Sequence, residues 1–251
     1  MDGSSCPIGD IHMKNLLLEL DTLPMDFIMS VGPACRPAQQ VKHAGLRFTA
    51  APMDWMQLYP LGAVTHIFET GFADFFAEIE DITPEPGKKN RRVVDTKNDI
   101  CSIHHFPSKV SLEKGQADVR KTMVKRYKRI HGILKNAERI CFVCNREDSP
   151  EALLRFMADF RRIYPHAHMV MVNMRHRDTD GIAMAKYGDG KCTLYEASFR
   201  DENPKGTDIA ANPEAWHGNT PCWQEVLQHV HLSEKTQKRA NSKLRKLLGL
   251  N

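Results

Sequence analysis

The sequence lacks several features that would assign a function directly. Its apolar stretches fall well short of the roughly 18 residues that indicate a membrane span, and the N-terminal MDGSSCPIGDIHMK lacks the basic-then-apolar layout of a secretory signal. It contains no GKS or GKT phosphate loop, no GxGxxG after an apolar strand and no GxSxG nucleophile elbow. We therefore expect a cytoplasmic protein with no membrane partner, no nucleotide dependence and no serine chemistry.

Cysteine is present, but not in a pattern that indicates disulfides or zinc. The seven cysteines are odd in number and scattered, so free thiols are expected. Cys141 and Cys144 form a CxxC, yet residues three apart on a strand point to opposite faces and no second CxxC accompanies them. The histidine pairs in PHAHM and HVH lack a third ligand. We expect no metal and no other cofactor.

Neither sign of charge dominates: 35 lysine and arginine residues face 31 aspartate and glutamate residues, for a formal net charge of +4. Much of the positive excess lies at the C-terminus, where a solvated basic helix or tail is expected over 233–251. No aromatic residues are interleaved with these cations to stack on bases, so nucleic acid is not an expected partner. The cations are Lys235, Lys238, Arg239, Lys243, Arg245 and Lys246.

Short apolar runs bounded by turn residues predict several strands. The segment 91–107, RRVVDTKNDICSIHHFP, has the form of a β-hairpin because two apolar runs flank Lys-Asn-Asp. The runs RICFVC and HMVMVNM, separated by a helical pattern, resemble a β-α-β unit. The remaining strands are expected at 27–31 and 191–197, whereas 14–20 is too short to classify.

Apolar positions at helical spacing predict four helices. The first begins at Arg36 and Pro37 and ends at Gly45, because proline fits a first turn and glycine a C-terminal end. No internal repeat and no sharp linker divides the chain, so one domain of α+β (mixed α/β) class is expected over 1–251. The other helices are expected over 61–80, with its aromatic residues in the core, 113–137 and 150–163, and 46–56 looks extended.

Cys35 lies between the predicted strand 27–31 and the N-terminus of the first predicted helix. At a helix N-terminus several backbone N–H groups are unpaired, and the positive end of the macrodipole favours a thiolate. The Arg36 guanidinium is expected nearby with the same effect. The free amides would also receive an oxyanion during acyl transfer. The alternative is that Cys35 is a small buried residue, as most cysteines are.

A thiolate nucleophile needs a base, and the best candidates lie in SIHHFP. A histidine at the end of a strand, next to a proline that stops the ladder, is fixed in orientation yet open at a rim. Successive side chains of a strand point to opposite faces, so only one of His104 and His105 can face the cysteine.

These residues carry a resemblance to a bacterial family of papain-like cysteine peptidases. The family motifs Gly-x-x-Cys, Pro-x-Asp-Trp and His-x-Phe-Pro are matched by 32–35, 52–55 and 104–107. RICFVCN and WHGNTPCW resemble two further motifs, so the resemblance covers about 26–230. It implies a papain-like core with a helix-borne cysteine and a sheet that carries the histidine, which it places on His104.

The sequence departs from the family pattern at three places. Pro33 and Ala34 replace the usual polar pair before the cysteine, which weakens a hydrogen bond at the nucleophile. His105 stands where an aspartate is common and removes a carboxylate beside the base, and Cys144 stands where an arginine is common.

A third residue is expected to hold the imidazole, and two candidates stay open. Asn145 ends the RICFVCN strand and Asp54 lies in the PMDW turn; each is of suitable type. Each also has a plain structural role, as a strand end or a turn residue. Trp55 and Trp216 have a separate expected role, either as walls of a pocket or as buried packing residues.

The expected chemistry is attack of the Cys35 thiolate on an acyl carbonyl, with His104 as base and then as acid. Resolution of the thioester by water defines a hydrolase of the peptidase or amidase type, which is the favoured reading. Resolution by an amine or alcohol defines an acyltransferase. A catalytically inactive binding domain is the third reading. The expected partner is a peptide, amide or acyl substrate.

Overall fold

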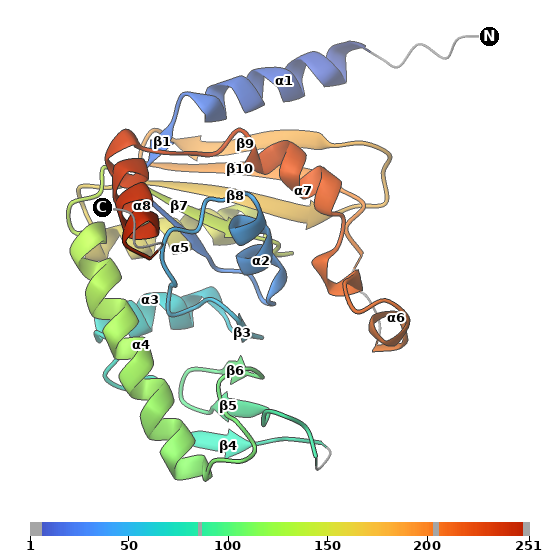
Figure 1. Ribbon diagram of the computed structural model, residues 1–251. Coiled ribbons are helices and arrows are strands. Elements are labelled where there is room, and N and C mark those ends of the chain that lie inside the picture. The colour runs from blue at the N-terminus through green and yellow to red at the C-terminus, as the bar shows by residue number, and fades with distance from the viewer. Residues whose placement is uncertain (1–6, 85–86, 203–205, 248–251) are drawn as a thin grey trace.

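The computed structural model describes residues 7–84, 87–202 and 206–247 (Figure 1). Helices account for 40% and strands for 23%, which confirms the mixed α and β class predicted from the sequence. Two sheets of different kind make up the β structure, and a short parallel pair joins β1 (Pro24–Met25) to β11 (His231–Leu232).

The larger sheet has five strands in the order β2-β7-β8-β10-β9. Its first four strands run parallel, and β9 pairs antiparallel with β10 at the edge. β7 and β8 are adjacent parallel strands joined by α5 (Pro150–Ile163), which confirms the predicted β-α-β unit. The strands are β2 (Phe27–Ser30), β7 (Arg139–Cys144), β8 (His168–His176), β10 (Cys192–Phe199) and β9 (Ala183–Asp189).

Helices cover both faces of this sheet (Figure 1). Because side chains alternate along a strand, Phe27 and Met29 face one apolar core while Ile28 faces the other. Strands that are buried on both faces read as continuous apolar runs, which is why they were visible in the sequence. One face carries α3 (Leu61–Glu69), α4 (Leu112–Leu134) and α5; the other carries α1 (Pro7–Asp21), α2 (Arg36–His43) and α7 (Thr220–Leu227).

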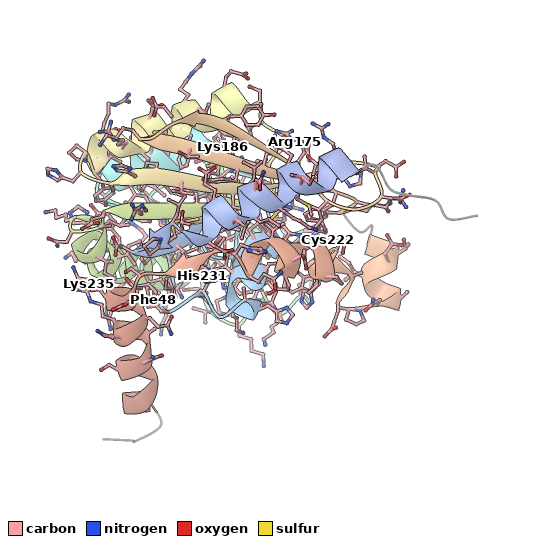
Figure 2. The ribbon with its side chains drawn as sticks, turned by 90° about the horizontal axis from the view of Figure 1, so that it is seen from above. Phe48, Arg175, Lys186, Cys222, His231 and Lys235 are labelled. Atoms are coloured by element: carbon pink, nitrogen blue, oxygen red, sulfur yellow. The ribbon has the colours of Figure 1, made fainter. Side chains whose placement is uncertain are left out.

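The N-terminal helix α1, which the sequence left unclassified, lies across the sheet beside β9 (Figure 2). Leu16, Leu17 and Leu20 are buried in the core beneath it. Glu19 forms an ion pair with Lys186 of β9 and accepts a hydrogen bond from the Tyr195 hydroxyl at 2.8 Å. Tertiary contacts therefore stabilise a helix that the sequence pattern was too short to predict.

The smaller sheet is antiparallel, with four strands in the order β3-β6-β5-β4. β5 and β6 form the predicted hairpin, whose turn is held by the Asp95 carboxylate. This sheet lies below the larger one in Figure 1, next to α4. Its strands are β3 (Met56–Gln57), β6 (Ile100–Ser102), β5 (Val93–Asp95) and β4 (Ile79–Asp81).

Two predicted elements are wrong in their extent. The segment 46–55, expected to be extended, is a succession of bends and turns, because the Asp54 carboxylate accepts from the Ala51 amide at 2.8 Å and closes a turn; of the predicted segment, Met56 alone belongs to a strand, β3. The helix expected over 61–80 stops at Glu69, because Gly71 follows with a positive φ of 62°. The aromatic side chains beyond it, Phe72, Phe75 and Phe76, are nevertheless buried in the core as expected.

The C-terminal region adds short helices. α6 (Gly206–Ala211) and the 3₁₀ helix η1 (Ala215–His217) precede α7, and α8 (Glu234–Leu247) forms the basic helix. Residues 248–251 and the side chains of Lys243, Arg245 and Lys246 lie outside the described residues. None of the helices described here is both long and apolar enough to cross a membrane.

Candidate functional site

The Cys35 loop is built by a tight passage from β2 to α2. A Cβ on Gly32 would lie 2.3 Å from Pro37 Cγ and 2.8 Å from Asn145 Oδ1, so only glycine fits at the end of the strand. Cys35 is the N-cap residue of α2, with proline in the first turn, as the sequence predicted. The Leu58 amide donates to the Pro33 carbonyl at 2.9 Å and ties this loop to the end of β3.

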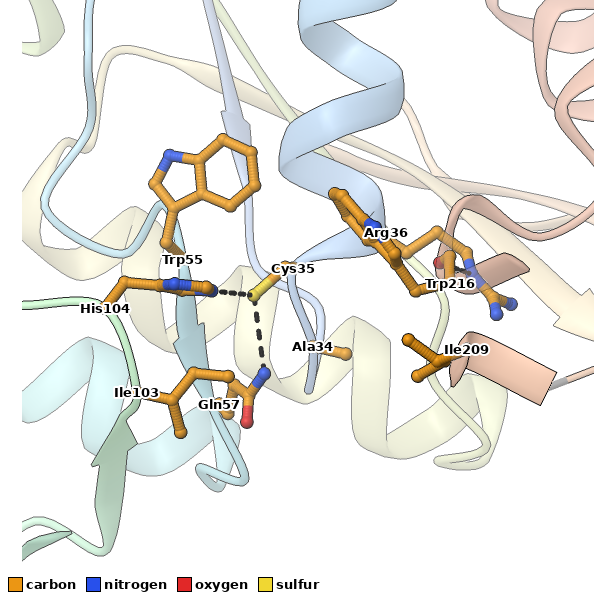
Figure 3. A pocket seen from close by; sticks show the side chains of 9 residues that line it. All are labelled: Ala34, Cys35, Arg36, Trp55, Gln57, Ile103, His104, Ile209 and Trp216. Atoms are coloured by element: carbon orange, nitrogen blue, oxygen red, sulfur yellow. Dashed lines mark hydrogen bonds between the residues drawn. The ribbon is translucent and has the colours of Figure 1, made fainter. Parts of the chain in front are cut away.

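The thiol of Cys35 contacts two polar side chains (Figure 3). Its Sγ lies 3.3 Å from His104 Nε2, and Gln57 Nε2 donates to it at 3.4 Å. The two partners come from the smaller sheet, Gln57 from β3 and His104 from just after β6. The β3–β6 pairing sets Gln57 opposite Cys101 and so brings both side chains to the sulfur.

Aromatic side chains surround the pair. Trp55 meets the His104 ring edge-on, with ring centroids 6.0 Å apart, and Trp216 at 6.3 Å. Trp55 and Leu58 have φ angles of 71° and 50°, which are strained values for bulky residues and which flank Gln57 in the chain. The surrounding structure must hold this segment in its strained conformation, and it thereby fixes the position of Gln57.

The sulfur opens into a cavity of about 410 Å³. Cys35 itself is only 6% exposed, and it lines this cavity. Apart from the thiol, its walls are largely aromatic and aliphatic. The lining residues are Ala34, Cys35, Arg36, Trp55, Gln57, Ile103, His104, Ile209 and Trp216.

The two adjacent histidines point apart. His104 faces the thiol, whereas His105 Nδ1 lies 2.9 Å from the Ser102 hydroxyl on the other side of the chain. Burial, reinforced by the Arg126 guanidinium, lowers the pKa of His105 to about 4, so that ring is neutral at pH 7. Of the two histidines, only His104 is in reach of Cys35.

Burial opposes ionisation of the thiol, contrary to the prediction from helix geometry. It raises the pKa of Cys35 above its ordinary value, and the Gln57 hydrogen bond offsets this only in part. Burial also lowers the pKa of His104. Both shifts favour the uncharged forms, so the resting pair is a thiol beside a neutral imidazole that is free to accept its proton.

Arg36 does not stabilise a thiolate as the sequence suggested. Its guanidinium turns away from the sulfur (Figure 3) and forms an ion pair with Asp201 at 2.8 Å, with side-chain exposures of 3% and 2%. It also donates to the carbonyl of Trp216 at 3.0 Å and to that of Glu202 at 2.9 Å. Arg36 therefore anchors the segment that forms one wall of the cavity.

Asp54 lies near the site without touching His104. Its buried carboxylate accepts hydrogen bonds from Ser30 Oγ at 2.9 Å and Arg47 Nε at 2.8 Å, besides the turn bond to Ala51. These contacts fix the turn that presents Trp55. The arrangement corresponds to the turn role that the sequence left open for this residue.

Asn145 is also not brought to His104. It packs on the opposite side of the Cys35 loop, where its Oδ1 is buried against Gly32 and has no hydrogen-bond partner among the described residues. Within the same residues, no hydrogen bond reaches Nδ1 of His104. The edge-on Trp55 ring is the aromatic contact that restrains the imidazole.

Sequence reasoning missed Gln57 and Ile209. Gln57 belongs to a two-residue strand and carries no motif, and a single amide among apolar residues is a weak signal. Ile209 lies on α6, more than 170 residues beyond Cys35, so no local pattern connects them. Trp216, by contrast, lines the cavity as one of its two sequence readings suggested.

The pKa directions predict the pH dependence of thiol alkylation. Iodoacetamide reacts with thiolates, so the rate at Cys35 should climb with pH through a pKa above the ordinary thiol value of 9.0. No plateau should appear near neutral pH, because burial favours the uncharged forms of both the thiol and the imidazole. Mass spectrometry of the alkylated Cys35 peptide measures this, with Cys35→Ala as the blank. A plateau at neutral pH would instead reveal a thiolate–imidazolium pair.

A cysteine at a helix N-terminus that meets a histidine from a separate sheet, at the mouth of a cavity, defines a papain-like thiol site. The chain matches the model of the family described as "Putative papain-like cysteine peptidase" over residues 26–163, more than half of its length. It therefore belongs to that family. The match includes Cys35 and His104 but ends before Trp216, so it is shorter than the 26–230 expected from the motifs.

One curated relative adds to the comparison. The chain is 23% identical over 144 residues to "Uncharacterized protein R408" of Acanthamoeba polyphaga mimivirus. The alignment covers 51% of this chain and 64% of the viral protein, so the chain spans less than two thirds of that relative. No solved structure matches the chain.

Proposed function

We propose that the protein is a cysteine hydrolase of the peptidase or amidase type that acts through a thioester on Cys35. The observation that supports this is the contact of 3.3 Å between the Cys35 sulfur and His104 Nε2 at the wall of a cavity. A nucleophile needs a base within hydrogen-bond reach, and this distance suits a sulfur donor in the absence of substrate. Membership of a papain-like peptidase family agrees with the same chemistry.

In the first half-reaction, His104 Nε2 accepts the Cys35 proton as the sulfur attacks the carbonyl carbon of an amide. A C–S bond forms and the carbonyl electrons move onto oxygen. The C–N bond then breaks, the His104 proton passes to the leaving nitrogen, and the acyl group stays on sulfur as a thioester. The low pKa of His104 favours the neutral ring that this first transfer requires.

In the second half-reaction, His104 removes a proton from water, which attacks the thioester. The C–S bond breaks, a carboxylic acid leaves, and the proton returns to the Cys35 sulfur. Gln57 assists both halves in this proposal, because its Nε2 donates to the sulfur at 3.4 Å and is therefore close to the carbonyl oxygen of an acyl group that the sulfur attacks. Asp54 and Asn145 act as positioning residues, the first through the Trp55 turn and the second beneath Gly32.

Trapping of the acyl-enzyme tests the proposal. Incubation with p-nitrophenyl acetate should release a burst of p-nitrophenolate and add one acetyl group to Cys35 in the intact-mass spectrum. Gln57→Leu should slow acylation by about 10²–10³-fold through loss of the oxyanion donor. Gln228→Leu, which alters an exposed amide at the C-terminal end of α7, is the matched control.

The fate of the trapped acetyl group separates the candidate functions. Loss to water at a rate unaffected by added amines supports the hydrolase. Faster loss in the presence of primary amines, with the corresponding amide as product, indicates an acyltransferase that uses the same pair. Absence of an acetyl group on Cys35 would contradict both enzymatic readings and leave the inactive binding domain.

A further inference from the structure

One wall of the cavity is built by a segment far from Cys35 in sequence. Ile209 of α6 and Trp216 of η1 lie with Ala34 on one side of the sulfur, and His104 lies on the opposite side (Figure 3). Ile209 is 39% exposed, which leaves apolar surface available at the cavity edge. We call Ala34, Ile209 and Trp216 the distal wall.

The position of His104 gives the cavity a direction. His104 must reach the nitrogen that leaves, so the leaving group lies on the His104 side of the sulfur. The acyl group that stays on Cys35 must then extend away from His104, toward the distal wall. This reasoning rests on the proposed function, because it needs His104 as the acid of the first half-reaction.

The distal wall offers no charge to an acyl group. Arg36 is the one formally charged residue in the described lining at neutral pH, and its guanidinium is directed outward to Asp201. A charged acyl side chain would lose its hydration there without gaining a partner. An apolar side chain would instead bury surface against Ile209 and Trp216.

The wall is also held in place before any substrate binds. Arg36 donates to the Trp216 carbonyl at 3.0 Å, and Gln40 donates to the His217 carbonyl at 2.8 Å. Gly218 has a φ of 70° and lies against the Arg36 and Asp201 side chains, where a Cβ would clash at 2.7 Å and 2.2 Å. The helix that follows the nucleophile therefore fixes the Trp216 part of the wall as well.

We propose that the distal wall is the acyl-side subsite, and that it selects substrates whose acyl group carries an uncharged branched aliphatic or aromatic side chain. The proposal assigns a specificity role to α6 and η1. Both lie outside the residues that match the family model.

Four acyloxymethyl ketones that differ only in the acyl-side residue, leucyl, phenylalanyl, lysyl and glutamyl, test the proposal. The sulfur displaces the carboxylate of the probe and forms a thioether, while His104 takes the thiol proton. Mass spectrometry gives the second-order rate at Cys35. We expect the leucyl and phenylalanyl probes to react at least about tenfold faster than the lysyl and glutamyl probes.

Two matched variants locate the preference. Ile209→Asp should reduce the leucyl-to-lysyl rate ratio at least about tenfold, because it replaces apolar surface with a negative charge. Ile11→Asp changes an isoleucine that is 59% exposed on α1, away from the cavity, and should leave the ratio unchanged. Both positions are exposed, so neither variant depends on repacking of the core.

The outcomes separate this inference from the proposed function. If all four probes label Cys35 faster than the other cysteines but at rates within about threefold of one another, the subsite assignment is wrong and the hydrolase proposal stands. An unchanged ratio in Ile209→Asp has the same meaning. If no probe labels Cys35 faster than the other thiols, the proposed function fails and the subsite fails with it.

Discussion

Replacing Arg36 with methionine should lower the free energy of unfolding by about 3–5 kcal/mol, the effect expected when one partner of a buried ion pair is removed. Asp201, whose side chain is 2% exposed, would lose its ion-pair partner. The carbonyls of Trp216 and Glu202 would also lose their donor. Urea denaturation followed by circular dichroism measures the change.

Arg200→Met provides the matched control for this experiment. Arg200 is 52% exposed and pairs with Asp178 at 2.6 Å, so its loss should change the free energy of unfolding by less than about 1 kcal/mol. Equal effects at the two positions would show that the Arg36–Asp201 pair contributes no more than a surface pair. The contrast thus tests whether Arg36 anchors the C-terminal segment, a role independent of any catalytic assignment.

Replacing His104 with alanine should slow acetylation of Cys35 by p-nitrophenyl acetate about 10²–10⁴-fold, the usual contribution of a positioned general base. The effect should be large because burial raises the pKa of the Cys35 thiol, so little thiolate forms without the imidazole. The burst of p-nitrophenolate measured in a stopped-flow spectrometer gives the rate.

His105→Ala separates a catalytic loss from a local structural one. His105 neighbours His104 in the chain but turns to Ser102, so its variant should acetylate within about threefold of the parent rate. A comparable loss in both variants would show that the strand end, rather than the His104 imidazole, controls reactivity. Retention of the parent rate in His104→Ala would remove His104 from the mechanism.

The Cys35 site depends on two separate parts of the fold, which the Arg36 and His104 variants test one at a time. The smaller sheet supplies the proton acceptor and Gln57, whereas α2 fixes the Trp216 part of the distal wall through Arg36 and Gln40. Substitution of Arg36 should therefore alter the cavity by displacing Trp216. Substitution of His104 should leave the fold intact and change proton transfer alone.

Local chemistry made much of the scaffold predictable from the sequence. The strand before Cys35, the helix that starts at Arg36 and the hairpin before His104 all follow from apolar runs bounded by glycine, proline or turn residues. The alternation of side chains on a strand also required that one of His104 and His105 face away from the thiol. These features depend on residues that are close together in the chain, so they can be predicted from the sequence alone.

Only the tertiary structure decided the environment of the sulfur. The β3–β6 pairing selected Gln57, and burial rather than the helix dipole set the direction of the Cys35 pKa shift. The partner of Arg36, Asp201, lies 165 residues away. Burial and pairing across such distances depend on how separate elements pack together, and no local pattern of residues specifies that.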